Sequence, residues 1–284
     1  MSEENKIRDA ADAIKGVVEA VPVYQDVVQP AAKEVGTALQ TVAKTIHIVL
    51  APVSALVWGY DKLTDFLSTR VADKLKDVPP ECIATPKPNV AGPALEALRY
   101  TGHEESLREM YANLLAASMD TRTAQGAHPA FVEIIKQLTP DEARLLKLFV
   151  VPRAFPLINV RREYKVTTDT ERGGNDLLVN FSLLGWEAGC DYPDETPTYL
   201  NNLCRLGLAE IPTMYEYTAP GVYDALENHS TVQAIKTAFE SNDKFRIDVA
   251  RGGLRITSLG RLFCNTCVVS HENKGLPVAS SPQA

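Results

Sequence analysis

The sequence has no excess of positive charge. Its 29 Lys and Arg residues are outnumbered by 36 Asp and Glu residues, which gives a formal net charge of −7. Acidic residues are in excess in both halves of the chain. Proteins that grip nucleic acid neutralise many phosphates with Lys and Arg, so this balance disfavours a strong electrostatic interaction with DNA or RNA.

The short motifs that mark common enzymes are also missing. The sequence contains no phosphate-binding loop, no dinucleotide-binding glycine fingerprint, no paired-histidine zinc helix and no nucleophile elbow. Glu104 follows His103, but no second histidine stands at the spacing that a zinc helix requires. We therefore expect a protein that is not an enzyme and that uses no cofactor.

No apolar run is long enough to cross a membrane. Residues 45–60 carry no formal charge, but Pro52 interrupts them and they fall short of the roughly 20 apolar residues of a spanning helix. We expect them to be buried in a helical bundle. The alternative is a segment that enters the membrane interface when triggered, with Trp58 and Tyr60 as anchors at its edge. The residues that would meet lipid are Ile46, Val49, Leu50, Val53, Leu56, Val57 and Trp58.

Cysteines are few and scattered. There are five, an odd number, and the charged first residues of the chain do not resemble a signal peptide. We expect reduced thiols and a cytoplasmic location, with attachment to the inner membrane only under the membrane alternative. Cys264 and Cys267 are followed by His271, but a zinc site normally needs four ligands. Thiols packed as small hydrophobic side chains are the simpler interpretation, and a metal site is the alternative.

Apolar residues with helical spacing fill the first half of the chain. They recur at three- and four-residue intervals along residues 1–78, which predicts a set of amphipathic helices. Five prolines in residues 79–93 predict a stiff, extended connector without regular helix. The helical pattern then resumes in residues 94–138.

The sequence pattern changes in residues 139–270, where strand-like runs alternate with short helical segments. Thr139, Pro140 and Glu142 have the spacing of a capping box at the start of a helix. The elements predicted after this helix are strand-like runs at 157–166 and 177–184, a short helix at 196–206, a strand at 208–211, a helical insert at 222–239, a hairpin with strands at 245–250 and 254–257 that turns at Arg251-Gly252-Gly253, and a last helix at 258–269.

This order of elements resembles a winged-helix domain. The predicted fold is therefore mainly α with a small β component, an N-terminal helical bundle followed by a winged-helix-like α+β domain and a disordered tail at 271–284. Among the residues of the recognition-type helix that could contact nucleic acid, only Arg205 is cationic, whereas DNA readers place several Lys and Arg on phosphates. We favour a protein-interaction role, with DNA binding as the alternative. The residues that would contact nucleic acid are Thr198, Asn201, Asn202, Arg205, Arg251 and Arg255.

A second set of polar residues falls among the predicted helices of 94–138. Asn113 stands on a helix with broad apolar faces, and a buried amide must find hydrogen-bond partners. The simple interpretation is a network that sets how the helices pack, and the alternative is a site for a ligand or partner. This polar set consists of Arg99, Tyr100, His103, Asn113, Asp120 and His128.

Three runs within residues 91–149 carry a family resemblance. They are GPALEAL at 92–98, LREMYANLLAASMD at 107–120 and HPAFVEIIKQL at 128–138. The region resembles the bacterial abortive-infection alpha family, whose members are associated with phage exclusion. The family is not known for a reaction or for catalytic residues. The resemblance implies a role in defence against bacteriophage, which we expect to involve contacts with a phage or host protein.

Overall fold

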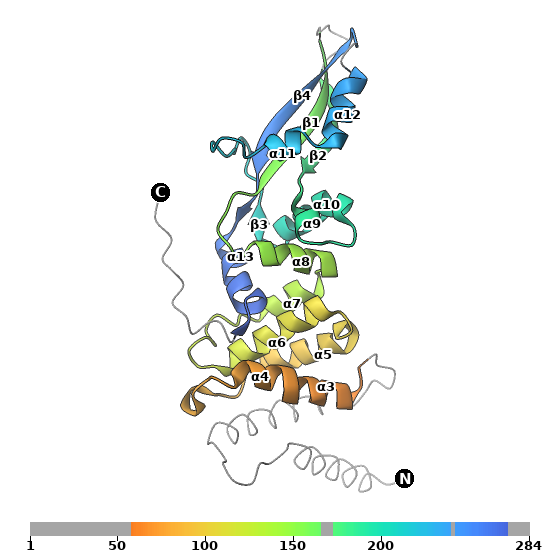
Figure 1. Cartoon of the computed structure of the whole chain (residues 1–284). Coiled ribbons are helices and arrows are strands. Elements are labelled where there is room, and N and C mark those ends of the chain that lie inside the picture. The colour runs from red at the N-terminus through yellow and green to blue at the C-terminus, as the bar shows by residue number, and fades with distance from the viewer. Residues whose placement is uncertain (1–57, 166–172, 240–241, 272–284) are drawn as a thin grey trace. The chain divides into compact units, whose positions relative to one another are not determined.

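The computed structural model describes residues 58–165, 173–239 and 242–271, and the chain divides into two compact units (Figure 1). The first unit comprises the residues up to Gln137 together with those from Thr266 onward, and the second is Leu138–Asn265. The helices predicted before residue 58 and residues 272–284 of the predicted tail lie outside the described residues. The prediction of a disordered tail is wrong for its first residue, His271, which is buried.

Helices build the described part of the first unit. They are α3 (Tyr60–Phe66), a π-helical stretch η1 (Leu67–Val71), α4 (Ala72–Leu75), a 3-10 turn η2 (Pro80–Cys82), α5 (Pro88–Thr101), α6 (Glu105–Met119) and α7 (Ala130–Lys136). The apolar stripe predicted here is buried, as Leu63, Val71 and Leu75 show. Its helical spacing placed these side chains on one face, which packs against the rest of the unit.

The central helix of the first unit is α6. It contacts α5, α7, α4 and η1, and every residue from Met110 to Met119 is buried. Small residues such as Ala112 and Ala116 let neighbouring helices approach closely. Because α6 is covered on all sides here, the polar side chain of Asn113 is buried as well.

The predicted connector at 79–93 is wrong over its last six positions. Helix α5 begins at Pro88 and continues through Pro93. Pro88 takes the first helical position, where the missing N–H has no helical partner to lose. Pro93 does cost a helical hydrogen bond. The burial of Val90 and Leu95 on the same helix offsets that cost through apolar surface removed from water.

The second unit combines short helices with two small antiparallel sheets. Its helices are α8 (Pro140–Leu148), α9 (Leu184–Glu187), η3 (Pro193–Glu195), α10 (Thr196–Arg205), α11 (Asp224–Glu227), α12 (Ser230–Phe239) and α13 (Ser258–Phe263). Its strands are β1 (Pro156–Tyr164), β2 (Gly174–Phe181), β3 (Ala209–Glu210), β4 (Phe245–Gly253) and β5 (Arg255–Ile256). A π-helical stretch, η4 (Cys264–Val268), follows α13. The prediction of a mainly helical chain with a small β component is confirmed.

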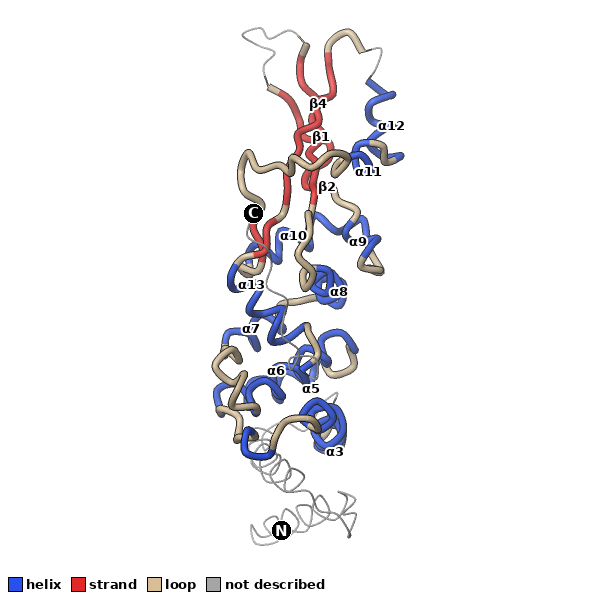
Figure 2. Tube along the Cα trace, turned by 60° about the vertical axis from the view of Figure 1, so that its left-hand side comes forward, coloured by secondary structure: helices blue, strands red, loops and turns tan. Residues whose placement is uncertain are grey.

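In the larger sheet, β1 lies between β2 and β4 (Figure 2). One face of this sheet is covered by α11 and α12 (Figure 1). Its buried core joins Ile158 and Val160 of β1 to Leu226 and Val232 of the two helices. The predicted helical insert therefore supplies the apolar cover that a sheet needs on at least one face.

The hairpin predicted at residues 251–253 is wrong. Arg251, Gly252 and Gly253 all continue β4 and pair with β1, while β5 pairs with β3 in the other sheet. Gly253 serves packing rather than a turn. A Cβ atom at Gly253 would lie 2.7 Å from the ring of Tyr217, so the absent side chain lets this ring lie against the strand.

Candidate functional site

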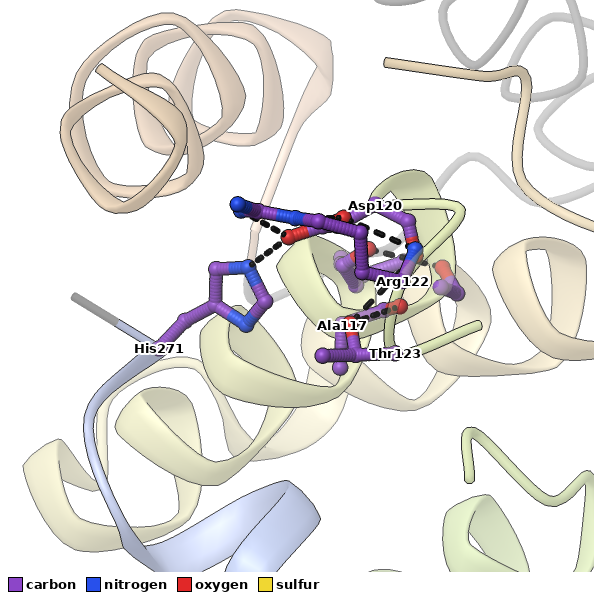
Figure 3. Close-up of polar contacts among 7 residues, drawn as sticks. Ala117, Asp120, Arg122, Thr123 and His271 are labelled. Carbon is purple, nitrogen blue, oxygen red and sulfur yellow. Dashed lines mark hydrogen bonds and ion pairs between the residues drawn. The ribbon is translucent and has the colours of Figure 1, made fainter. Parts of the chain in front are cut away.

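Two sets of polar residues predicted separately from the sequence meet at the C-terminal end of α6 (Figure 3). The Nε2 atom of His271 lies 3.1 Å from Oδ2 of Asp120. About two helical turns before Asp120, the side-chain amide of Asn113 donates to the carbonyl oxygen of Cys267 at 2.9 Å. Residues 266–271 therefore lie against α6 within the first unit. We call Asp120, Arg122 and His271 the Asp120 cluster.

The backbone holds Asp120 in place from two directions. Ile83 forms an isolated antiparallel bridge with Asp120, and two flanking backbone hydrogen bonds of 2.8 Å join the same segments. On the other side, the Thr123 hydroxyl donates to the carbonyl of Ala117 at 2.9 Å, which satisfies a carbonyl left open at the helix end (Figure 3). The carboxylate thus sits on a rigid support.

Arg122 forms an ion pair with Asp120. Its Nε and Nη2 atoms donate to the two carboxylate oxygens at 2.9 and 2.7 Å, and its backbone N–H donates to Oδ1 at 3.0 Å. Burial alone would raise the pKa of Asp120, but these hydrogen bonds and the charges of Arg122 and His271 together lower it. The hydrogen bond to Asp120 likewise raises the pKa of Arg122. Asp120 is therefore an ionised carboxylate whose oxygens accept hydrogen bonds from other residues of the chain.

The other members of the predicted polar set do not join this cluster. Tyr100 is exposed, and His103 lies at the surface with its Nε2 atom 3.4 Å from a carboxylate oxygen of Glu104. His128 accepts a hydrogen bond from the Ala130 backbone at the start of α7. Arg99 is buried in α5. The sequence analysis missed Arg122, whose signal was a cation two positions after a carboxylate at a helix end.

The three candidate metal ligands do not converge. The thiol of Cys264 donates to the carbonyl of Leu146 at 3.8 Å, whereas His271 contacts Asp120. Burial raises the pKa of Cys264 to about 12, which disfavours the thiolate that a metal binds. Within residues 58–165, 173–239 and 242–271, no three His, Cys, Asp or Glu side chains are grouped so that they could hold a metal ion.

A second buried carboxylate, which the sequence analysis did not single out, organises the second unit. Asp141 accepts hydrogen bonds from the backbone N–H groups of Asp191 and Tyr192 at 2.9 and 3.0 Å and from the Tyr199 hydroxyl at 3.0 Å, and it pairs with Arg144. Burial raises the pKa of Asp141, but these donors and the Arg144 charge lower it below its ordinary value. We call these residues the Asp141 cluster.

The neighbouring start of α8 agrees with the prediction. Thr139 and Glu142 form the expected capping box, with hydrogen bonds in both directions. The Glu142 carboxylate also accepts a hydrogen bond of 2.7 Å from Asn202 of α10. The cap therefore ties α8 to α10 in addition to satisfying the helix end.

Most of the residues predicted to contact nucleic acid have side-chain partners. Arg205 donates to the side chain of Asn202, Arg251 pairs with Glu227 at 2.6 Å, and Arg255 pairs with Glu210 at 2.7 Å. Thr198 donates to Glu195 at 3.1 Å, and Asn201 is exposed. The carboxylates paired with Arg251 and Arg255 reduce the positive potential that would attract phosphate.

Most of the predicted membrane segment lies outside the described residues. Its last member, Trp58, is 8% exposed and packs edge-on against Phe66 with ring centroids 6.0 Å apart. In the portion of the chain that the structure describes, no helix has the length and apolar character needed to span a bilayer.

A groove of about 450 Å³ lies beside Trp58 in the first unit. Its charged and polar lining comes from the first turns of α3, from η1 and from the segment around the start of α6. We call it the Trp58 groove and define it by Trp58, Lys62, Asp65, Arg70, His103 and Arg108. It contains three permanent cations and one carboxylate.

Comparison with known proteins agrees with the resemblance seen in the sequence. A family model described as abortive infection alpha matches residues 59–267. No curated protein matches the chain. A similar solved structure is that of an uncharacterized protein from the hydrocarbon-degrading marine bacterium Alcanivorax borkumensis SK2. It is 24% identical, the match covers 53% of this chain and 99% of that chain, and the TM-score is 0.33.

Proposed function

The chain belongs to the abortive infection alpha family, and from this premise we propose that it limits bacteriophage infection in the bacterial cytoplasm by binding another protein. The proposal has two parts, a biological role and a mode of action. The family supports the role. The chemistry of the buried polar clusters supports a mode of action through binding rather than catalysis.

The proposed mode of action rests on one observation: the oxygens of the buried carboxylates accept hydrogen bonds from other groups of the chain. Asp120 and Asp141 are both nearly inaccessible, and their oxygens accept from Arg122 and His271 in one case and from backbone N–H groups and Tyr199 in the other. A general acid or base must reach the reacting atom directly or through one water. Groups saturated by internal donors are better suited to stabilising a fold that presents a binding surface.

We further propose that the second unit uses a winged-helix arrangement as a protein-binding module. The elements in favour are α8 and α10, which the Glu142–Asn202 hydrogen bond joins, and the short β3–β5 pair ahead of α13. Leu259 and Leu262 of α13 and Met214 before α11 are exposed apolar side chains. Such side chains contribute to binding when a partner covers them.

Plating assays with intact cells test the biological role. Expression of the full chain in a susceptible bacterial host should reduce plaque formation by at least one phage in a broad panel. Cultures infected at low phage-to-cell ratio should survive, while those infected at high ratio should collapse, because abortive infection removes the infected cells. Unchanged plating across the panel would refute the role.

Variants separate the role from the mode of action. Asp120→Asn should lose protection in proportion to its loss of folded protein, and Asp176→Asn, at an exposed position of β2, serves as its control. Protection that disappears in a Asp120→Asn variant with unchanged thermal stability and abundance would contradict a purely structural carboxylate and would favour catalysis.

The DNA-binding alternative has less support. Its candidate arginines at positions 205, 251 and 255 each have a side-chain partner. A fluorescence-anisotropy titration with random duplex DNA distinguishes the two. Binding that weakens steeply with salt would favour the DNA-binding alternative.

A further inference from the structure

The Trp58 groove holds two guanidinium groups that share one carboxylate. Oε1 of Glu105 lies 3.8 Å from Nη2 of Arg70, and Oε2 of the same carboxylate pairs with Arg108. A bridging carboxylate between two guanidinium groups has the same charge pattern as a phosphate group held by two arginines. Glu105 therefore occupies the place that an anionic ligand would take.

Arg108 is fixed in position before any ligand arrives. Its Nη1 atom donates to the carbonyl of Gly102 at 3.1 Å, and its guanidinium lies 5.9 Å from the centre of the Trp58 ring. That ring in turn rests on Gly102, where a Cβ atom would lie 2.5 Å from it. A cation held by packing and by a backbone acceptor loses little conformational freedom when it binds an anion.

The bridging carboxylate is easy to displace. The Glu105 side chain is 62% exposed and that of Arg70 is 51% exposed, and ion pairs of this kind typically contribute only about 0–1 kcal/mol. Two further carboxylates lie nearby. Asp65 lines the groove, and Glu109 pairs with the buried Lys74 at 2.9 Å and more loosely with Arg70 at 3.6 Å. Lys62 lines the same groove and adds a third permanent cation that a dianion could approach.

We propose that the Trp58 groove binds a phosphate group, with Arg70 and Arg108 as its main ligands and with Glu105 as the intramolecular group that it displaces. A groove of about 450 Å³ falls within the range of small-molecule sites. The phosphate belongs either to a small soluble molecule or to the headgroup of an anionic lipid. The inference goes beyond the proposed defence role and stands or falls independently of it.

The test measures binding of inorganic pyrophosphate to the full chain. The chain contains two tryptophans, so a Trp186→Phe background leaves Trp58 as the fluorescent reporter inside the groove. Arg108→Gln should weaken binding about tenfold, the effect of one lost charge-assisted hydrogen bond. Arg70→Gln should weaken it in the same direction and provides a second variant if Arg108→Gln does not fold. Arg251→Gln, which removes an equal charge from the second unit, should leave the affinity unchanged.

The most discriminating variant is Glu105→Gln. It should tighten pyrophosphate binding about threefold, because the competing carboxylate is gone and its pairing was weak. Glu133→Gln is the matched control, since Glu133 is an exposed residue of the same unit that pairs with Lys136. Unchanged or weaker binding by Glu105→Gln would overturn the displacement mechanism.

Vesicles separate the two sources of phosphate. Phosphatidylcholine vesicles with and without phosphatidic acid are sedimented with the same variants. Pyrophosphate binding without sedimentation supports a soluble ligand, and sedimentation that follows the Arg108 and Glu105 variants supports a lipid headgroup. The proposal is overturned if the full chain binds neither probe, or if Arg251→Gln reduces binding as much as Arg108→Gln does.

Discussion

The imidazole Nε2 atom of His271 lies 3.1 Å from the carboxylate Oδ2 atom of Asp120, although 151 positions separate the two residues in the chain. Only 4% of His271 and 1% of Asp120 is exposed. Together with the Asn113–Cys267 hydrogen bond, this contact fastens the last described residues to α6. The chain therefore returns to its first unit after completing the second.

Removing the Asp120 charge should destabilise the protein. In Asp120→Asn, the donors of Arg122 and His271 lose an ionised acceptor in a buried site, and breaking one partner of such a network costs about 3 kcal/mol. Urea unfolding followed by circular dichroism measures the change in the free energy of unfolding. Asp176→Asn, which removes an exposed carboxylate paired with Arg161, should change it by less than about 0.5 kcal/mol. Equal effects of the two substitutions would contradict the role assigned to Asp120.

Acid should weaken the fold through the same carboxylates. The pKa values of Asp120 and Asp141 are lowered from their ordinary value of 3.8, so the unfolded chain binds protons at a higher pH than the folded protein does. Their contribution is present above the ordinary carboxyl pKa and is lost as the pH falls through the lowered values. Urea midpoints measured from pH 7 to pH 3 should therefore decrease, and the decrease should be smaller in Asp120→Asn and in Asp141→Asn. A wild-type slope retained in both variants would exclude these two groups as its cause.

Gly260 should not tolerate a methyl group even though it lies in helix α13. Alanine is favoured over glycine by about 1 kcal/mol inside a helix, yet a Cβ atom at Gly260 would lie 1.9 Å from the carbonyl oxygen of Leu208. Gly260→Ala should therefore lower the free energy of unfolding by about 2 kcal/mol or more. Gly59→Ala is the control, because a Cβ atom there has no neighbour within 4 Å, and it should leave the thermal midpoint nearly unchanged. A gain in stability from Gly260→Ala would show that α13 can move away from the Leu208 carbonyl.

Predictions from short stretches of sequence agreed best with the structure. The capping box at Thr139 forms as its spacing indicated, and α10 ends one residue before the predicted boundary at Leu206. Such features depend on residues within one helical turn of each other, so the local sequence contains all their partners. Pro93 shows where local inference fails, because tertiary packing keeps it inside α5.

The sequence predicted several residues of the candidate site but not the contacts between them. Asn113 and Asp120 were assigned to one set and Cys267 and His271 to another, and the structure joins the sets across α6. The helical period predicted that Asn113 would be partly buried. Its acceptor, the Cys267 carbonyl, is a backbone atom with no sequence signature, so no pattern could have identified it.

By itself, the sequence determined the helices of the described part of the first unit, the capped start of α8, the mixed composition of the second unit and the family to which the chain belongs. Each of these features follows from the spacing of apolar and capping residues or from runs of neighbouring residues. Only the tertiary structure decided that β4 pairs with β1 rather than turning back on β5, that His271 meets Asp120, and that Glu105 bridges two arginines. Those contacts depend on which distant surfaces can bury their apolar atoms together while satisfying their polar ones, a condition that no single stretch of the chain contains.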